Sequence, residues 1–149
     1  MSLIRKHTRR VTTAALTLAM AAALGAAGAG ASSAGTAAPQ TREIASSTLG
    51  SDYKITLTAL RSTQDEYAAS VRLQVYRQSG GGWQESDRVT VGGVDGWFWY
   101  PLTGKGAVCE FSTASSEPAP LTVSLLLTPS LGCSEPAHYV VKEGKVYAG

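Results

Sequence analysis

The residue best suited to acid–base chemistry is His138, the one histidine of two that lies outside the first ten positions. A serine hydrolase would combine such a histidine with a nucleophile and an orienting carboxylate, and Ser134 and Glu135 are close to it in the sequence. Residues of one short loop rarely converge in this way, and the sequence has no Gly-x-Ser-x-Gly motif. We therefore predict no catalytic residue and a protein that is not an enzyme.

The sequence also has no strong candidate for a metal site. Zinc sites take three or four ligands, whereas His138 has no second histidine near it. The carboxylates that lie near expected turns are Asp52, Asp65, Glu66, Asp87 and Asp95. They are scattered and do not form an Asp-x-Asp-x-Asp-Gly calcium loop. We predict no metal site and no cofactor.

Cys109 and Cys133 are the two cysteines of the chain. They lack C-x-x-C spacing and a companion cluster of Cys or His residues, which argues against a redox-active pair and against a metal site. In an exported chain, two cysteines permit a single intramolecular disulfide. Closing a loop of about 25 residues contributes about 3.5 kcal/mol in the chain-entropy description. We therefore predict that this disulfide stabilises a small domain.

One short segment is rich in aromatic residues: Trp97, Phe98, Trp99 and Tyr100. Successive side chains of a strand point to opposite faces, so one pair of these rings faces outward unless another segment covers it. Exposed aromatic rings provide dispersion surfaces for the sugar rings of a polysaccharide. The candidate ligand-binding residues are therefore Trp97, Trp99, Trp83 and Tyr100. The alternative is that the tryptophans fill the core beneath the disulfide.

A second candidate for recognition is segment 112–120, which is rich in Ser, Thr and Pro and lies between the two cysteines. Its prolines and the covalent link limit its flexibility, and a low cost of ordering favours tight binding to a protein. A protein partner, as for an inhibitor of a secreted protease, is therefore our alternative to a polysaccharide. The segment also fits an ordinary solvated connection between two strands.

The elements that position these residues are expected to be β-strands, because apolar residues recur with a period of two after residue 52. The clearest runs, 53–59 and 69–75, are typical of a hairpin. Further strands are expected at 89–91, 97–100, 107–112, 121–128 and 138–147. No segment after residue 50 has the apolar spacing of a helix over three turns. The predicted fold is all-β, a small single-domain β-sandwich or Greek-key barrel of about six to eight antiparallel strands.

The first 31 residues have the pattern of a secretory signal peptide. A basic start is followed by an uncharged run rich in Ala and Leu, and Ala29-Gly30-Ala31 provides the small residues that signal peptidase requires. A transmembrane anchor is the rival interpretation, but the second half of the run consists of Ala and Gly, which contribute little transfer free energy. We predict a secreted, extracellular protein with no membrane segment after cleavage.

The rest of the chain is expected to divide into a leader and one domain. Residues 32–51, rich in Ala, Ser and Thr, are predicted to be flexible because they have too little apolar surface to offset the entropy of ordering. Residues 52–149 then form one β-domain, which we expect to be a monomer. Beyond the first ten positions, nine basic residues stand against eleven acidic ones, which argues against a nucleic-acid partner. The predicted function is a non-enzymatic binding module for a glycan, a cell-wall polymer or another surface ligand.

Overall fold

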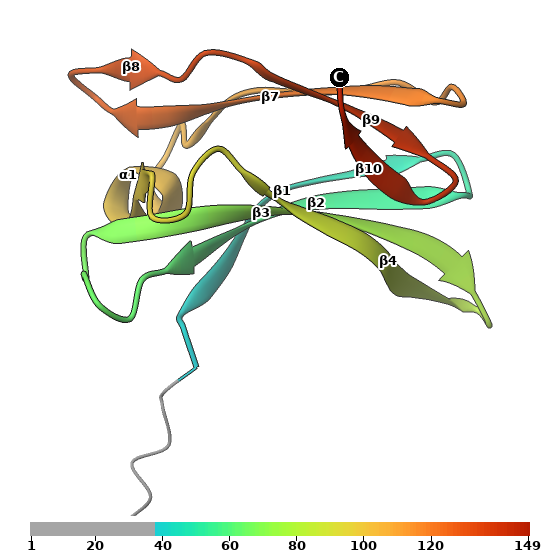
Figure 1. Ribbon diagram of the computed structural model, residues 1–149, viewed down its shortest axis with the longest axis horizontal. Helices are drawn as coiled ribbons and strands as arrows, with labels where there is room; N and C mark the ends of the chain where they lie inside the picture. The colour runs from blue at the N-terminus through green and yellow to red at the C-terminus, as the bar shows by residue number, and fades with distance from the viewer. Residues whose placement is uncertain (1–37) are drawn as a thin grey trace, which may run out of the picture. The chain divides into compact units, whose positions relative to one another are not determined.

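The computed structural model describes residues 38–149, which fold into two antiparallel β-sheets and one short helix. Figure 1 shows the sheets as two layers, with helix α1 (Trp99–Thr103) at one end. This arrangement confirms the predicted all-β sandwich. Within residues 38–149, no helix is long and apolar enough to cross a membrane. The predicted signal peptide, 1–31, and the first part of the predicted leader, 32–37, lie outside the described residues.

The first sheet has five strands and is organised around β3. Its strands are β1 (Thr41–Leu49), β2 (Tyr53–Arg61), β3 (Ala68–Ser79), β4 (Gly82–Val91) and β5 (Trp97–Phe98). The strand order is β1-β2-β3-β4, and β5 also pairs with β3. The register places Leu57 opposite Leu73, and Leu73 opposite Val89, so the apolar side chains of three strands lie on one face.

The second sheet also has five strands and is organised around β7. Its strands are β6 (Val108–Thr113), β7 (Ala119–Thr128), β8 (Gly132–Cys133), β9 (Ala137–Lys142) and β10 (Lys145–Ala148). The strand order is β10-β9-β7-β6, and β8 also pairs with β7. Leu121 lies opposite Tyr139, and both contribute to the core.

The inner faces of the two sheets share one hydrophobic core. Its fully buried members from β3 and β7 include Val71, Leu73, Val75, Val123 and Leu125. These residues follow the period of two that the sequence shows, because alternate side chains of a strand point to the same face. Burying a Val or Leu side chain contributes about 1.5–3 kcal/mol, so the apolar alternation accounts for much of the attraction between the sheets.

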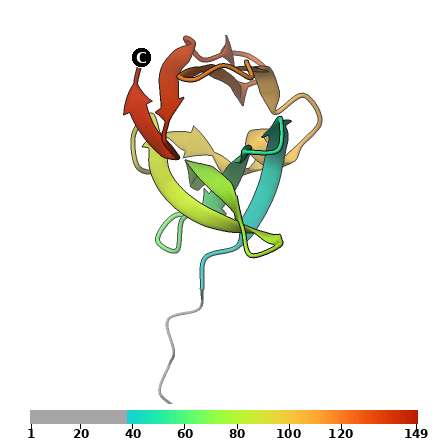
Figure 2. The same cartoon turned by 90° about the vertical axis from the view of Figure 1, so that its right-hand side faces the viewer.

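Side-chain hydrogen bonds join the two sheets along both edges, and the view of Figure 2 shows the sheets curving around their shared interior. On one side, the hydroxyl groups of Ser47 in β1 and Thr113 in β6 are 3.0 Å apart. On the other side, the carboxylate of Asp87 in β4 accepts a hydrogen bond from the backbone N–H of Val146 in β10, at 2.8 Å. The second contact occupies a backbone N–H at the edge of the second sheet, where another strand could otherwise pair.

Residues 41–49 form strand β1, so the prediction of a flexible leader over 32–51 is wrong for this part of the chain. The strand pairs with β2 along its length. In β1 only Leu49 is buried, and Ile44 and Ala45 are partly buried against the core. An edge strand needs few apolar residues, because backbone pairing with its neighbour supplies the order that composition alone does not predict.

The aromatic segment 97–100, predicted to be one strand, is divided between β5 and α1. Pro101 lies in the first turn of α1. Proline is tolerated there because the first N–H groups of a helix have no intrahelical acceptor. Trp99 and Leu102, three residues apart, both point into the core. A helix of five residues is too short for a search over three turns to detect.

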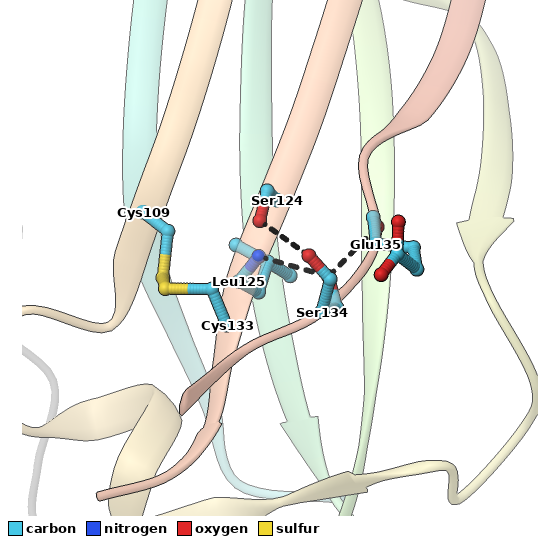
Figure 3. The surroundings of a disulfide bond; sticks show 6 residues. All are labelled: Cys109, Ser124, Leu125, Cys133, Ser134 and Glu135. Carbon is cyan, nitrogen blue, oxygen red and sulfur yellow. Dashed lines mark hydrogen bonds between the residues drawn. A yellow bond between two sulfur atoms is a disulfide. The ribbon is translucent and has the colours of Figure 1, made fainter. Parts of the chain in front are cut away.

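Cys109 of β6 and Cys133 of β8 form the predicted disulfide, with their Cα atoms 6.2 Å apart (Figure 3). Beside it, the hydroxyl of Ser134 accepts a hydrogen bond from the backbone N–H of Leu125, at 3.2 Å. The hydroxyl of Ser124 in turn donates to the carbonyl of Ser134, at 2.7 Å. The disulfide and these hydrogen bonds together fix β8 and the residue that follows it against the rest of the second sheet.

Candidate functional site

Three aromatic side chains are exposed at the end of the sandwich that carries α1: Tyr67, Phe98 and Tyr100. Their exposed fractions are 59%, 43% and 56%, respectively. We call these three residues the aromatic end. Grouped apolar surface on a soluble domain marks a place where a ligand or partner gains energy by covering it. The aromatic end is therefore the candidate functional site.

Backbone pairing brings the aromatic end together from two distant segments. In the register of β3 with β5, Ala68 lies opposite Phe98. The chain then turns into α1, where the N–H of Trp99 donates to the carbonyl of Tyr67, at 2.8 Å. As a result, the ring centroids of Tyr67 and Tyr100 are 6.0 Å apart, and the ring planes are inclined at 53°. This is a tilted aromatic contact of the kind that stabilises both rings.

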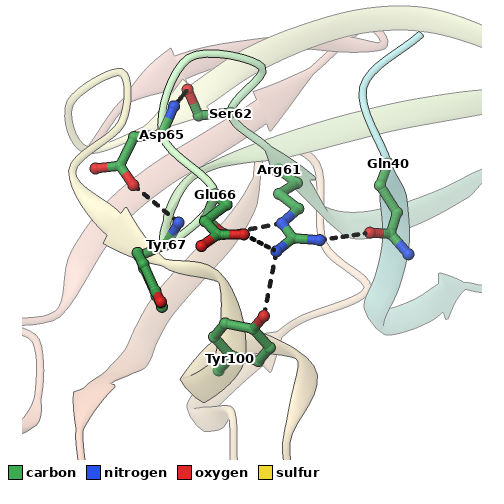
Figure 4. A network of polar contacts seen from close by, with 7 residues as sticks. All are labelled: Gln40, Arg61, Ser62, Asp65, Glu66, Tyr67 and Tyr100. Carbon is green, nitrogen blue, oxygen red and sulfur yellow. Dashed lines mark hydrogen bonds and ion pairs between the residues drawn. The ribbon is translucent and has the colours of Figure 1, made fainter. Parts of the chain in front are cut away.

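Arg61, the last residue of β2, fixes the position of Tyr100 (Figure 4). Its guanidinium donates to the hydroxyl of Tyr100 and to the side-chain carbonyl of Gln40, each at 3.2 Å. Its Nε donates to the backbone carbonyl of Glu66, at 2.8 Å, and the Glu66 carboxylate lies 3.8 Å from the guanidinium. The guanidinium is also 5.7 Å from the ring of Trp99 and 5.6 Å from that of Tyr100. These are cation–π distances, so one charged group links the buried ring to the exposed ring.

The turn between β2 and β3 determines the position of Tyr67. The hydroxyl of Ser62 accepts hydrogen bonds from the N–H groups of Gln64 and Asp65, at 3.3 and 3.4 Å. The carboxylate of Asp65 accepts one from the N–H of Tyr67, at 2.9 Å (Figure 4). Short polar side chains commonly satisfy backbone donors in turns in this way. The turn is therefore held by its own side chains before any ligand binds.

Trp97 and Trp99, both predicted to bind a ligand, lie in the core, so that prediction is wrong for them. They are 7% and 6% exposed, and Nε1 of Trp97 donates to the backbone carbonyl of Val91, at 2.8 Å. The cause is the register, because Trp97 lies opposite Ala69, whose side chain is fully buried on the inner face. The alternative interpretation, in which these tryptophans fill the core, is the one that the structure shows.

Trp83 is accessible, with an exposed fraction of 38%, but it does not belong to the aromatic end. It lies opposite Gln78, next to the turn between β3 and β4. Tyr67 precedes the opposite end of β3, a strand of twelve residues. At about 3.3 Å per residue, the two ends of this strand are roughly 30 Å or more apart. Of the predicted ligand-binding residues, Tyr100 alone is part of the site.

Segment 112–120, the alternative recognition site, is partly strand, which leaves residues 114–118 as the connecting loop. The carboxylate of Glu117 accepts a hydrogen bond from the N–H of Glu143, at 2.9 Å, which ties this loop to the turn between β9 and β10. The disulfide does not constrain the loop closely, because Cys109 lies near the start of β6 and the loop follows its end.

The residues considered for acid–base chemistry have other partners in the structure. Nδ1 of His138 lies 3.2 Å from the hydroxyl of Thr122 on the neighbouring strand. The hydroxyl of Ser134 donates to the backbone carbonyl of Glu135, at 3.1 Å. In the part of the chain that the structure describes, no group of three or more His, Cys, Asp or Glu side chains is arranged to hold a metal ion.

Two members of the aromatic end, Tyr67 and Phe98, were not among the predicted ligand-binding residues, and neither was Arg61, which contacts Tyr100. Nothing in the sequence indicates that the guanidinium of Arg61 contacts Tyr100. The contact depends on the pairing of β3 with β5, which joins segments far apart in the chain. No protein-family model, curated protein or solved structure matches this chain, so the inference of function rests on the aromatic end itself.

Proposed function

We propose that this domain is a secreted, non-enzymatic binding module that binds a glycan at the aromatic end. The observation that carries the proposal is the joint exposure of Tyr67, Phe98 and Tyr100 beside a network of polar groups. Aromatic faces offer the apolar face of a sugar ring a dispersion surface. The neighbouring side chains of Gln40 and Glu66 offer an amide and a carboxylate for sugar hydroxyl groups.

The geometry of the rings favours one form of glycan over another. Tyr67 and Tyr100 are inclined at 53°, so both rings cannot lie flat on one planar surface. A flat crystalline polysaccharide would contact one ring and leave the other uncovered. A single chain that twists or branches can place successive sugars against both. We therefore propose a soluble or single-chain glycan as the ligand.

Preorganisation supports the same proposal. Arg61 already holds the hydroxyl of Tyr100, and Asp65 already holds the backbone of Tyr67. Ordering a mobile side chain on binding costs about 0.5–1.5 kcal/mol, and this cost is largely absent where the side chain is held beforehand. The Cys109–Cys133 disulfide is in keeping with an extracellular location, because disulfides persist in oxidising compartments.

The test is a glycan array probed with the purified chain, followed by affinity measurements on the glycans that bind. Tyr100 is 56% exposed, which for a ring with about 200 Å² of surface leaves roughly 110 Å² accessible. Covering about half of this area is worth roughly 1.4 kcal/mol at 25 cal/mol/Å². We expect Tyr100→Ala and Tyr67→Ala each to weaken binding about tenfold.

Tyr147→Ala is the matched control, because Tyr147 is a 51% exposed tyrosine on β10, in the other sheet. It should leave the affinity unchanged. Failure of the chain to bind any glycan would contradict the proposal, as would equal binding by the Tyr67→Ala and wild-type proteins. The protein-binding alternative predicts a different outcome, in which Glu117→Ala in the 114–118 loop abolishes capture of a protein partner and the tyrosine variants do not.

A further inference from the structure

A recess lies beside the aromatic end, and Tyr100 belongs to both. It has a volume of about 400 Å³, within the range of small-molecule sites. The residues that line it are Tyr100, Pro101, Gly104, Lys105, Leu126 and Pro129. It lies between α1 with its following turn and the end of β7, two segments that the fold brings together. We call this recess the α1–β7 cleft.

The α1–β7 cleft combines an apolar lining with one positive charge. Tyr100, Pro101, Leu126 and Pro129 contribute apolar surface, and Lys105 is the one ionisable amine among the lining residues. Over residues 38–149 the salt bridges join Arg61 to Glu66 and Arg88 to Glu85, so Lys105 has no carboxylate partner there. An exposed ammonium at an apolar recess attracts an anion whose apolar part enters the recess.

We propose that the α1–β7 cleft binds a soluble amphiphilic acid, that is, a molecule with an apolar chain or ring and a carboxylate group. The apolar part would lie against Leu126 and Pro129, and the carboxylate would pair with the ammonium of Lys105. This inference does not depend on glycan binding at the aromatic end, because the residues proposed to bind the acid, Lys105, Leu126 and Pro129, lie outside the aromatic end.

Both walls of the cleft are held in place without a ligand. On the α1 side, Trp99 and Leu102 are anchored in the core, and the hydroxyl of Thr103 donates to the carbonyl of Trp99, at 2.9 Å. On the β7 side, the N–H of Leu126 donates to the carbonyl of Ala107, at 2.8 Å. The disulfide secures β8, which follows the turn that contains Pro129. A preformed recess loses little affinity to ordering on binding.

The experiment measures the binding of sodium decanoate and decanol to the purified chain at concentrations where both are monomeric. Decanoate should bind about three- to fivefold more tightly than decanol, as expected for one partly exposed ion pair. Lengthening the acid from hexanoate to decanoate should raise the affinity by up to about fourfold for each added methylene group. Lys105→Met should remove the preference for the acid and leave decanol binding unchanged.

Matched variants separate the cleft from other surfaces. Pro129→Asp places a charge in the apolar wall and should weaken decanoate binding tenfold or more, whereas Pro136→Asp, at another exposed proline, should not. Lys145→Met on β10 controls for the loss of a positive charge elsewhere. Tyr67→Ala should weaken glycan binding and leave decanoate binding unchanged, so the two sites can fail independently.

Three outcomes would overturn the proposal. They are equal affinity of the wild-type protein for decanoate and decanol, unchanged decanoate binding in Lys105→Met, and binding to phosphatidylglycerol vesicles without binding to monomeric decanoate. If Pro129→Asp fails to fold, the comparison of Lys105→Met with Lys145→Met still decides, because both lysines are exposed.

Discussion

Asp87 provides a direct test of how the two sheets are joined. Its carboxylate accepts the hydrogen bond from the N–H of Val146, at 2.8 Å, at a place where β4 and β10 are adjacent but not paired as a ladder. We predict that Asp87→Ala destabilises the domain by removing this link. The N–H of Val146 would then be left without its acceptor.

The expected loss follows from the type of hydrogen bond. A hydrogen bond to a charged group contributes about 1.5–3 kcal/mol, and Asp87 is partly buried, so we expect a loss of about 2 kcal/mol. This is a large fraction of a total stability of about 5–15 kcal/mol. For a domain of this size it corresponds to a decrease in Tm of about 8 °C. Asp87→Asn keeps an acceptor oxygen and should lose less.

Two measurements check this prediction. Urea unfolding, followed by tryptophan fluorescence, gives the change in the free energy of unfolding. Hydrogen exchange of the Val146 amide reports on the link itself, and the amide should exchange faster in Asp87→Ala than in the wild-type protein. Glu135→Ala, which removes an exposed carboxylate from a loop, serves as the control. A change in the free energy of unfolding below about 0.5 kcal/mol is typical of ordinary surface substitutions. Such a change, together with an equally protected Val146 amide, would refute the claim that this hydrogen bond joins β4 to β10.

The remaining predictions concern the core, the disulfide and alkaline stability. Trp97→Ala should lower the free energy of unfolding by about 3–5 kcal/mol in urea unfolding, because the side chain is buried; a loss below 1 kcal/mol would mean that Trp97 does not pack in the core. Reducing the Cys109–Cys133 disulfide should lower the free energy of unfolding by about 3.5 kcal/mol. If the disulfide causes this difference, a double Cys→Ser variant should be as stable as the reduced protein. Burial raises the pKa of Tyr139 above its ordinary value of 10.0, so its contribution to stability is complete below pH 10 and decreases as the pH rises through the folded-state pKa. Unfolding measured from pH 8 to 11 should show a smaller alkaline loss in Tyr139→Phe, and an identical loss in both proteins would contradict this assignment.

Much of the fold could be predicted because it depends on local pattern. The alternation of apolar and polar residues across 69–75 identifies β3, since a strand exposes alternate side chains to the core. The disulfide followed from there being two cysteines in a chain with an export signal pattern. Both inferences needed no knowledge of which segments lie next to each other.

Other features depend on contacts between distant segments and were therefore not predictable. Strand β1 (Thr41–Leu49) buries little apolar surface and is ordered by pairing with β2, so its composition resembles that of a flexible leader. The period of two correctly separates Trp97 from Phe98 onto opposite faces. It does not tell which face is the inner one, because that depends on the buried Ala69 opposite Trp97.

The candidate site depends even more on contacts between distant segments, which the sequence does not predict. Tyr100 was predicted from the aromatic segment. Tyr67 joins it through the pairing of β3 with β5, and Arg61 contacts it because α1 approaches the end of β2. The roles of these residues arise from the tertiary structure. A sequence search for clustered aromatic residues therefore finds the segment and misidentifies which of its rings are accessible.

The central claim is that the aromatic end is the ligand-binding surface. Its most direct test is an NMR titration of the purified chain with an oligosaccharide selected from the array, observing the aromatic resonances. We predict progressive shifts of Tyr67, Phe98 and Tyr100 with one common dissociation constant, and no shift of Tyr147 or Trp83. Shifts confined to Trp83, or a titration without any shift at the aromatic end, would contradict the claim.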